Sequence, residues 1–260
     1  MRKNRGSFMV KFCVLFLILS IFISCAEDKN VNVGNFTVSE SYNYKLQMAI
    51  SYVVSGHFQR AISELEDLRK QKETPELYNY LGLSYMGIGS FDKALIAYKR
   101  AIELKPDYTE GYSNISACYI ALGDYDKAIE YASKALSDDT YPKPEIPLTN
   151  MAQAYFGKGE SEKAIELLNK AISLNPFSSV PYEILIKYYL EKDDYQRAKR
   201  YLNDAIDLEV ESPGILFYRA LFKLRDGDRE EAKKLFKEIS KNYTGTDWAA
   251  QAKVYLEVIE

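Results

Sequence analysis

The 260-residue chain has few of the residues that build catalytic and metal sites. It contains a single histidine, His57, and three cysteines, Cys13, Cys25 and Cys118. It has no HExxH, GxSxG, P-loop or CxxC motif. His57 follows Gly56 with no serine or cysteine motif beside it, so we interpret it as a turn residue. The sequence predicts a protein that is not an enzyme, with no cofactor, no metal and no small-molecule substrate.

Basic runs are also lacking. The chain has 34 basic and 37 acidic residues, a formal net charge of −3, and its charges alternate in sign over short distances. Proteins that bind nucleic acid electrostatically usually concentrate lysine and arginine on one face. The sequence therefore predicts no nucleic-acid partner. The paired aspartates at 138–139 and 193–194 fall at predicted turns, where aspartate caps helices, and isolated pairs are weak indications of a metal site.

Small and aromatic residues recur with a period close to 34 residues. Six alanines are spaced by 33, 34, 36, 34 and 34 residues: Ala61, Ala94, Ala128, Ala164, Ala198 and Ala232. A small or medium residue precedes each of them by twelve positions: Ala49, Gly82, Ser116, Ala152, Ile186 and Ala220. Five of the six alanines also have a tyrosine nine positions earlier: Tyr52, Tyr85, Tyr119, Tyr155 and Tyr189. A fixed period with small residues at fixed positions is typical of a solenoid of stacked repeats.

Each period reads as two helices joined by a short turn. In residues 75–108, Tyr78, Leu81, Gly82 and Tyr85 share one helical face, and Gly82 would let the second helix approach closely. Pro106 would end that second helix, because proline cannot continue the backbone hydrogen-bond ladder. Cys118, inside such a helix without a disulfide partner, is predicted to be a small buried residue.

These positions resemble the tetratricopeptide repeat, whose motif has a large residue, Leu-Gly, Tyr, Ala, an aromatic, Ala and Pro in that order. The resemblance implies an all-α, right-handed superhelical solenoid. Six units can be aligned, at 42–74, 75–108, 109–142, 145–178, 179–212 and 213–246, and a capping helix at 247–260. The sixth unit is the most degenerate, as is expected of a terminal repeat.

The first 25 residues indicate export. Four basic residues precede the apolar stretch 12–23, which is too short to span a bilayer comfortably. Phe22-Ile23-Ser24-Cys25 resembles the bacterial lipobox, which implies a signal peptide at 1–24, acylation of Cys25, and a lipidated tether at 25–40. An uncleaved signal anchor is the alternative. Ala26, by resemblance to enterobacterial sorting rules, indicates the periplasmic face of the outer membrane.

The inner face of the first helices is the predicted protein-binding groove, since tetratricopeptide arrays typically bind their partners there. In the first four units this face is mostly apolar, with some amides and hydroxyls that could hold a peptide. The predicted groove residues are Leu46, Ile50, Val53, Val54, Asn79, Leu83, Met86, Ser113, Ala117, Ile120, Thr149, Gln153 and Phe156. In the fifth unit the face becomes charged, with Glu183, Lys187 and Glu191. Alternatively, the tether folds back and covers the first-unit residues.

An exported lipoprotein of six such units resembles the type IV pilus biogenesis and stability lipoproteins PilF, PilW and Tgl, the pilotins of the pilus secretin. The most specific parts are the break after the third unit, at Tyr141-Pro142, and the pattern from Asn175-Pro176 to Ala198-Lys199. The resemblance implies that the partner is the secretin and that the protein promotes secretin localisation or assembly. A periplasmic adaptor of the NlpI type for cell-envelope enzymes is the alternative. A subunit that binds cell-wall glycan would need more exposed aromatics than the single Trp248 and the tyrosines placed in the core.

Overall fold

The computed structural model describes residues 38–259. The chain divides into two compact units, Met1–Lys45 and Leu46–Glu260, and the repeats are considered within the second. The predicted signal peptide, Cys25 and tether residues 25–37 lie outside the described residues. Residues 38–40, assigned to the tether in the sequence, are helical instead, because the first described helix begins at Val38.

The prediction of an all-α fold is confirmed, since the described residues form thirteen helices and no strand. Twelve of them form consecutive pairs, one pair in each predicted unit. The pairs are α2 (Val38–Val54) and α3 (Phe58–Arg69), α4 (Pro75–Gly87) and α5 (Phe91–Leu104), α6 (Thr109–Ala121) and α7 (Tyr125–Leu136), α8 (Glu145–Gly157) and α9 (Ser161–Leu174), α10 (Ser179–Glu191) and α11 (Tyr195–Asp207), and α12 (Pro213–Arg225) and α13 (Arg229–Asn242). A single helix, α14 (Asp247–Ile259), follows the last pair.

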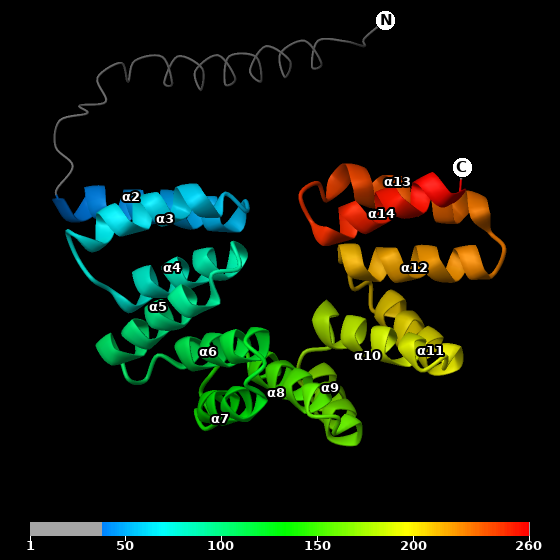
Figure 1. Cartoon of the computed structure of the whole chain (residues 1–260), viewed down its shortest axis with the longest axis horizontal. Helices are drawn as coiled ribbons and strands as arrows, with labels where there is room; N and C mark the ends of the chain where they lie inside the picture. Colours follow the sequence, from blue (N-terminus) through cyan, green and yellow to red (C-terminus); the bar gives the residue numbers. More distant parts are fainter. Residues whose placement is uncertain (1–37, 260) are drawn as a thin grey trace, which may run out of the picture. The chain divides into compact units, whose positions relative to one another are not determined.

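Within residues 46–260, the helical hairpins follow one another in chain order along a curved path (Figure 1). In the middle of this array α6, α8 and α10 lie on the inner side of the curve, and their partners α7, α9 and α11 lie on the outer side (Figure 1). From α3 to α14 each helix contacts the next one along the chain, which is the pattern of a superhelical repeat protein.

The turn within each hairpin has one residue with a left-handed backbone. Five turns use glycine there, with φ between +73° and +87°: Gly56, Gly89, Gly123, Gly159 and Gly227. The fifth unit has Asp193 at this position, with φ +56°. Glycine adopts this conformation without the steric cost that a Cβ atom brings.

The small residues of the repeat are buried where helices approach most closely. All six periodic alanines have no exposed surface. A Cβ atom added to Gly82 would lie 2.4 Å from the Tyr98 ring, so glycine is required for α4 to pack on α5 at this distance. The close approach of the helices at Gly82 agrees with the sequence-based expectation, and the Tyr98 ring fills the space that the missing side chain leaves.

In each of the first five units, a basic side chain lies over the tyrosine that recurs nine residues before the periodic alanine. The five pairs are Arg60 with Tyr52, Lys93 with Tyr85, Lys127 with Tyr119, Lys163 with Tyr155 and Arg197 with Tyr189, at 4.4–5.7 Å from the charge centre to the ring centroid. Each pair joins the two helices of one hairpin and contributes about 0.5–1 kcal/mol at an exposed site. The sixth unit has Lys223 and Glu231 at these positions, and Lys223 instead pairs with Asp228 at 3.2 Å.

Helix α14 covers the apolar face of the last hairpin. Ala249, Ala252 and Ile259 are buried, and Trp248, Tyr255 and Leu256 pack against the same core. The Tyr255 ring stacks on Phe236 with centroids 5.1 Å apart. The helix therefore supplies the contacts that a following repeat would otherwise make.

None of the described helices is both long enough and apolar enough to cross a membrane.

Candidate protein-binding groove

The first helices of successive units lie side by side. Asn114 Nδ2 on α6 donates a hydrogen bond to Asn79 Oδ1 on α4 (2.7 Å), and Asn150 Nδ2 on α8 donates to the Ser113 carbonyl on α6 (2.9 Å). Farther along the array, Phe156 on α8 contacts Tyr188 on α10, and α10 contacts α12. Together α4, α6, α8, α10 and α12 form one continuous surface.

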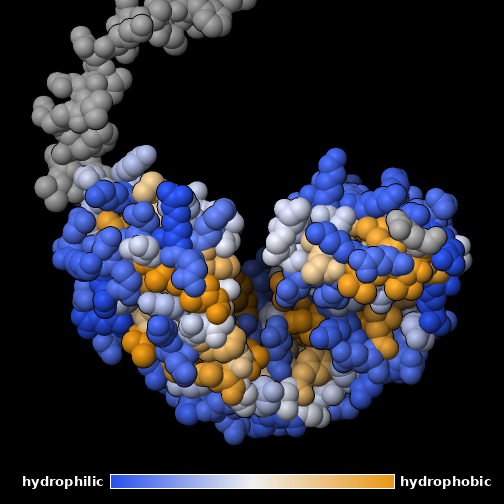
Figure 2. Space-filling model, turned by 45° about the horizontal axis from the view of Figure 1, so that its top comes forward, coloured by the Kyte–Doolittle hydropathy of each residue, from blue (hydrophilic) through white to orange (hydrophobic). Residues whose placement is uncertain are grey.

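A large open pocket lies on this surface over α6, α8 and α10. Its volume is about 860 Å³, within the range of ligand-binding clefts. The three first helices contribute Ile120 from α6, Gln153 and Phe156 from α8, and Ile184, Lys187, Tyr188 and Glu191 from α10. Tyr125, Gly159, Ser161 and Lys192 complete its lining. In the space-filling view, apolar patches lie on the walls of the hollow that the helices enclose (Figure 2).

The aromatic rings of the pocket are fixed by one another. The Phe156 and Tyr188 ring centroids are 4.8 Å apart, and Tyr188 meets Tyr189 edge to face at 5.2 Å. Tyr189 in turn stacks on Tyr201 at 5.8 Å, deep in the fifth unit. Rings held in this way present apolar area to a partner at little further cost in conformational entropy.

Charged groups are found at one side of the pocket. Lys187 and Glu191 form a weak ion pair at 3.9 Å, and Lys192 Nζ lies 5.9 Å from the Tyr188 ring centroid. All three side chains are exposed. The pocket therefore combines an apolar floor with a polar rim, the anatomy of protein interfaces.

Ten of the thirteen predicted groove residues are at least partly exposed. Ile120, Gln153 and Phe156 line the pocket itself. Leu83 and Met86 are half-buried and, like Ile120, pack against the core of the second and third units, and Ala117 is half-buried on α6. Leu46, Ile50 and Val53 are half-buried on α2, and Val54 is 83% exposed; none of these four lines the pocket.

The other three predicted residues are buried. Asn79, Ser113 and Thr149 occupy equivalent positions in successive units and are 2%, 1% and 5% exposed. Asn79 accepts the bond from Asn114, and the Thr149 hydroxyl donates to the Glu145 carbonyl at 2.7 Å. Asn79 and the Ser113 carbonyl contact the neighbouring first helix, and Thr149 bonds within its own helix, so none of the three side chains is presented on the surface.

Several pocket residues were not predicted from the sequence, notably Tyr188, Ile184 and Tyr125. The fifth unit was expected to present Glu183, but its carboxylate accepts a hydrogen bond from the Ser212 hydroxyl at 2.7 Å and packs on Gly214. This contact directs Glu183 toward α12. The face that meets the pocket is consequently Ile184, Lys187, Tyr188 and Glu191, whose spacing of three and four residues is visible in the sequence.

Cys118 is the free cysteine among the described residues and is buried, as predicted. Burial raises the pKa of its thiol to about 12, and its Sγ lies 3.2 Å from the Met86 Sδ. The thiol is therefore protonated at neutral pH and packs beneath the surface as an apolar group.

The paired helices, the periodic alanines and the stacked first helices define a helical-repeat solenoid of the protein-binding class. Family models described as tetratricopeptide repeat match residues 75–108, 107–176 and 215–246. The chain belongs to the tetratricopeptide-repeat family.

Solved structures share this fold. PilW, described as a widely conserved type IV pilus biogenesis factor, is 20% identical with a TM-score of 0.61, over 82% of this chain and 98% of its own. PilF of Pseudomonas aeruginosa is 15% identical with a TM-score of 0.58, over 84% and 98%. A tetratricopeptide repeat protein from Parabacteroides merdae is 17% identical with a TM-score of 0.67, over 97% and 94%. Among curated proteins, none matches the sequence.

Proposed function

We propose that this protein is a non-catalytic scaffold, anchored to the outer membrane through acylated Cys25, that binds a segment of the type IV pilus secretin in its groove. The observation that carries the proposal is the open pocket over α6, α8 and α10, with its floor of Phe156 and Tyr188. The fold shared with PilW and PilF, over nearly the whole length of both, supports the choice of partner.

The pocket suits a polypeptide. Its apolar floor matches the non-polar face of an amphipathic helix, and Gln153, Lys187 and Glu191 can bond to the polar flanks of such a segment. Anchoring at the membrane would raise the effective concentration of the scaffold near the assembling secretin, so a modest affinity would be sufficient.

The test is capture of secretin from detergent-solubilised envelope by the immobilised protein. Phe156→Asp should reduce capture about ten-fold or more, because it places a charge where an aromatic anchor is expected. Phe177→Asp is the matched control, since Phe177 lies in the α9–α10 loop, is 68% exposed and does not line the pocket. Circular dichroism should show the same helical content for both variants.

Equal capture by both variants would contradict the groove assignment. Capture of envelope hydrolases without secretin would instead favour the NlpI-like adaptor. The anchor is tested separately, by measuring the mass of the mature chain. A mature chain that begins at Cys25 and has the added mass of its acyl groups is expected, and an unmodified Cys25 would rule the anchor out.

A further inference from the structure

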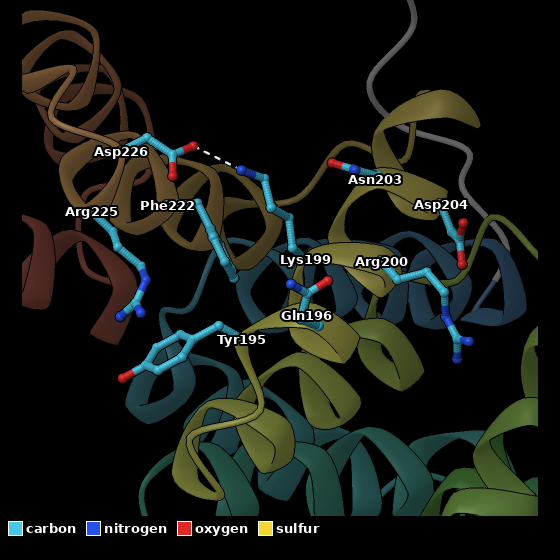
Figure 3. A pocket seen from close by; sticks show the side chains of 9 residues that line it. All are labelled: Tyr195, Gln196, Lys199, Arg200, Asn203, Asp204, Phe222, Arg225 and Asp226. Atoms are coloured by element: carbon cyan, nitrogen blue, oxygen red, sulfur yellow. Dashed lines mark hydrogen bonds and ion pairs between the residues drawn. The ribbon is translucent and has the colours of Figure 1, made fainter.

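A second hollow lies between α11 and α12, away from the groove residues that the sequence predicts. It has a volume of about 540 Å³, and an adjoining pocket of about 350 Å³ shares Tyr195, Phe222 and Arg225 with it. Arg225 is exposed and lines both hollows, and the close view of the larger one shows it beside Tyr195 (Figure 3).

The guanidinium of Arg225 stacks on an aromatic ring and, within the described part of the chain, does not pair with a carboxylate. Its Cζ lies 3.2 Å from the centroid of the Tyr195 ring, and the two side chains converge in the close view (Figure 3). Asp226, the next residue, pairs with Lys199 at 2.8 Å, and Glu191 on α10 pairs with Lys187. Over residues 38–259, no carboxylate lies within ion-pair distance of Arg225.

Stacking of this kind prepares a guanidinium to bind a carboxylate. The flat face of the guanidinium covers the ring, while the N–H groups along its edge remain directed outward. Those N–H groups match the two oxygens of a carboxylate, and little side-chain entropy is lost on binding because the ring already orients the group.

Aliphatic and aromatic side chains form most of the lining of the adjoining pocket. Leu190, Leu221, Phe222 and Tyr255 supply its walls, together with Tyr195 and Arg225. A bound segment could thus place a carboxylate on Arg225 and an apolar side chain in the pocket at the same time. A polyanion is disfavoured, because Asp204 and Asp226 also line the larger hollow.

We infer that Arg225 and this apolar pocket form an anchor for a partner-protein helix that has an aspartate or glutamate within one turn of an apolar residue. This inference rests on the proposed function, since it places a second contact for the same partner at the carboxyl-terminal end of the array. It also specifies the chemistry of that contact, which the proposed function leaves open.

The partner segment can be identified by photo-crosslinking in cells, with p-benzoylphenylalanine in place of Tyr255 or, separately, Phe156. Both positions should crosslink to one protein, and the peptide joined to position 255 should contain an acidic residue within one turn of an apolar one. A crosslink at 156 with none at 255, or a peptide at 255 without an acidic residue, would overturn the anchor alone. No crosslink at either position would contradict the proposed function as well.

A synthetic peptide of the segment recovered at position 255 then gives a direct affinity, measured by fluorescence anisotropy. Arg225→Glu should weaken binding about ten-fold or more, the loss expected for a charge-assisted hydrogen-bonded pair, and Arg225→Lys should weaken it less. A peptide with lysine in place of its acidic residue should recover binding to Arg225→Glu.

Arg200→Glu provides the matched control. Arg200 lines the same hollow, its Cζ lies 4.9 Å from the Tyr201 centroid, and its side chain points away from Arg225 (Figure 3). The affinity of the Arg200→Glu variant should remain within about two-fold of wild type, the scale of a surface substitution. Equal losses for the two arginine variants would show general charge attraction and overturn the anchor.

Discussion

Gly82 has no side chain, and α4 can pack closely on α5 only because no Cβ atom is present at this position. The Tyr98 ring occupies the space next to Gly82, and Tyr98 itself is 1% exposed. Because interiors are close-packed, neither the ring nor the helix can move far to accept a larger residue.

Gly82→Val should therefore destabilise the protein by about 2 kcal/mol, the usual cost of overpacking a core. The midpoint of urea unfolding, followed by circular dichroism, measures the change. Ala121→Val, at the exposed end of α6, adds comparable bulk where there is room and should change stability by less than about 0.5 kcal/mol. A Gly82 variant as stable as the Ala121 variant would show that Tyr98 can move aside.

Individual residues also show where sequence reasoning succeeds and where it stops. The role of Gly82 follows from its phase in the repeat, because the close contact lies within one hairpin. Burial of Asn79, Ser113 and Thr149 depends on the angle between one hairpin and the next, which no local spacing specifies. Tyr188 was missed for a different reason: Glu183 was assigned to the exposed face of α10, whereas it is hydrogen-bonded to Ser212 at the start of α12.

Among the elements, the turns within the hairpins are the most uniform, and the fifth is the exception. Five of these turns use glycine with a left-handed backbone, and the turn of the fifth unit uses Asp193. Asp193 Oδ1 accepts a hydrogen bond from the Tyr195 hydroxyl at 3.1 Å, an exposed contact of small net value. A non-glycine residue in this conformation costs about 1 kcal/mol.

Asp193→Gly should therefore stabilise the protein by up to about 1 kcal/mol, and the reciprocal change Gly123→Asp should destabilise it by a similar amount. Both effects are read from thermal unfolding under identical conditions. The two shifts should have opposite signs. Destabilisation by Asp193→Gly would mean that the bond to Tyr195 outweighs the backbone strain.

In the array from Leu46 to Glu260, each hairpin contacts its neighbours in sequence, and stability is accordingly local. The sequence predicts the helix pairs because their period is independent of what lies next to them. It does not predict the pocket over α6, α8 and α10, because three units must stack before that surface exists.

Phe236→Ala tests this local character. Phe236 is fully buried, and its ring contacts Phe217 at 5.5 Å and Tyr255 at 5.1 Å, so its loss should cost about 3–5 kcal/mol in the sixth unit. Hydrogen exchange followed by mass spectrometry should show faster exchange in α12, α13 and α14, with α4 and α5 unchanged. Faster exchange throughout would instead indicate that the array unfolds as one cooperative body.

The pairing of a basic side chain with a tyrosine eight residues earlier has a genetic consequence. Both partners belong to the same hairpin, so duplication or deletion of one whole unit by recombination leaves every remaining pair intact. The contact of Asn114 with Asn79 joins two different hairpins, so deletion of either hairpin removes it. A gene of this kind can change its length in steps of one unit, and only the junction between units has to be repaired by later point mutation.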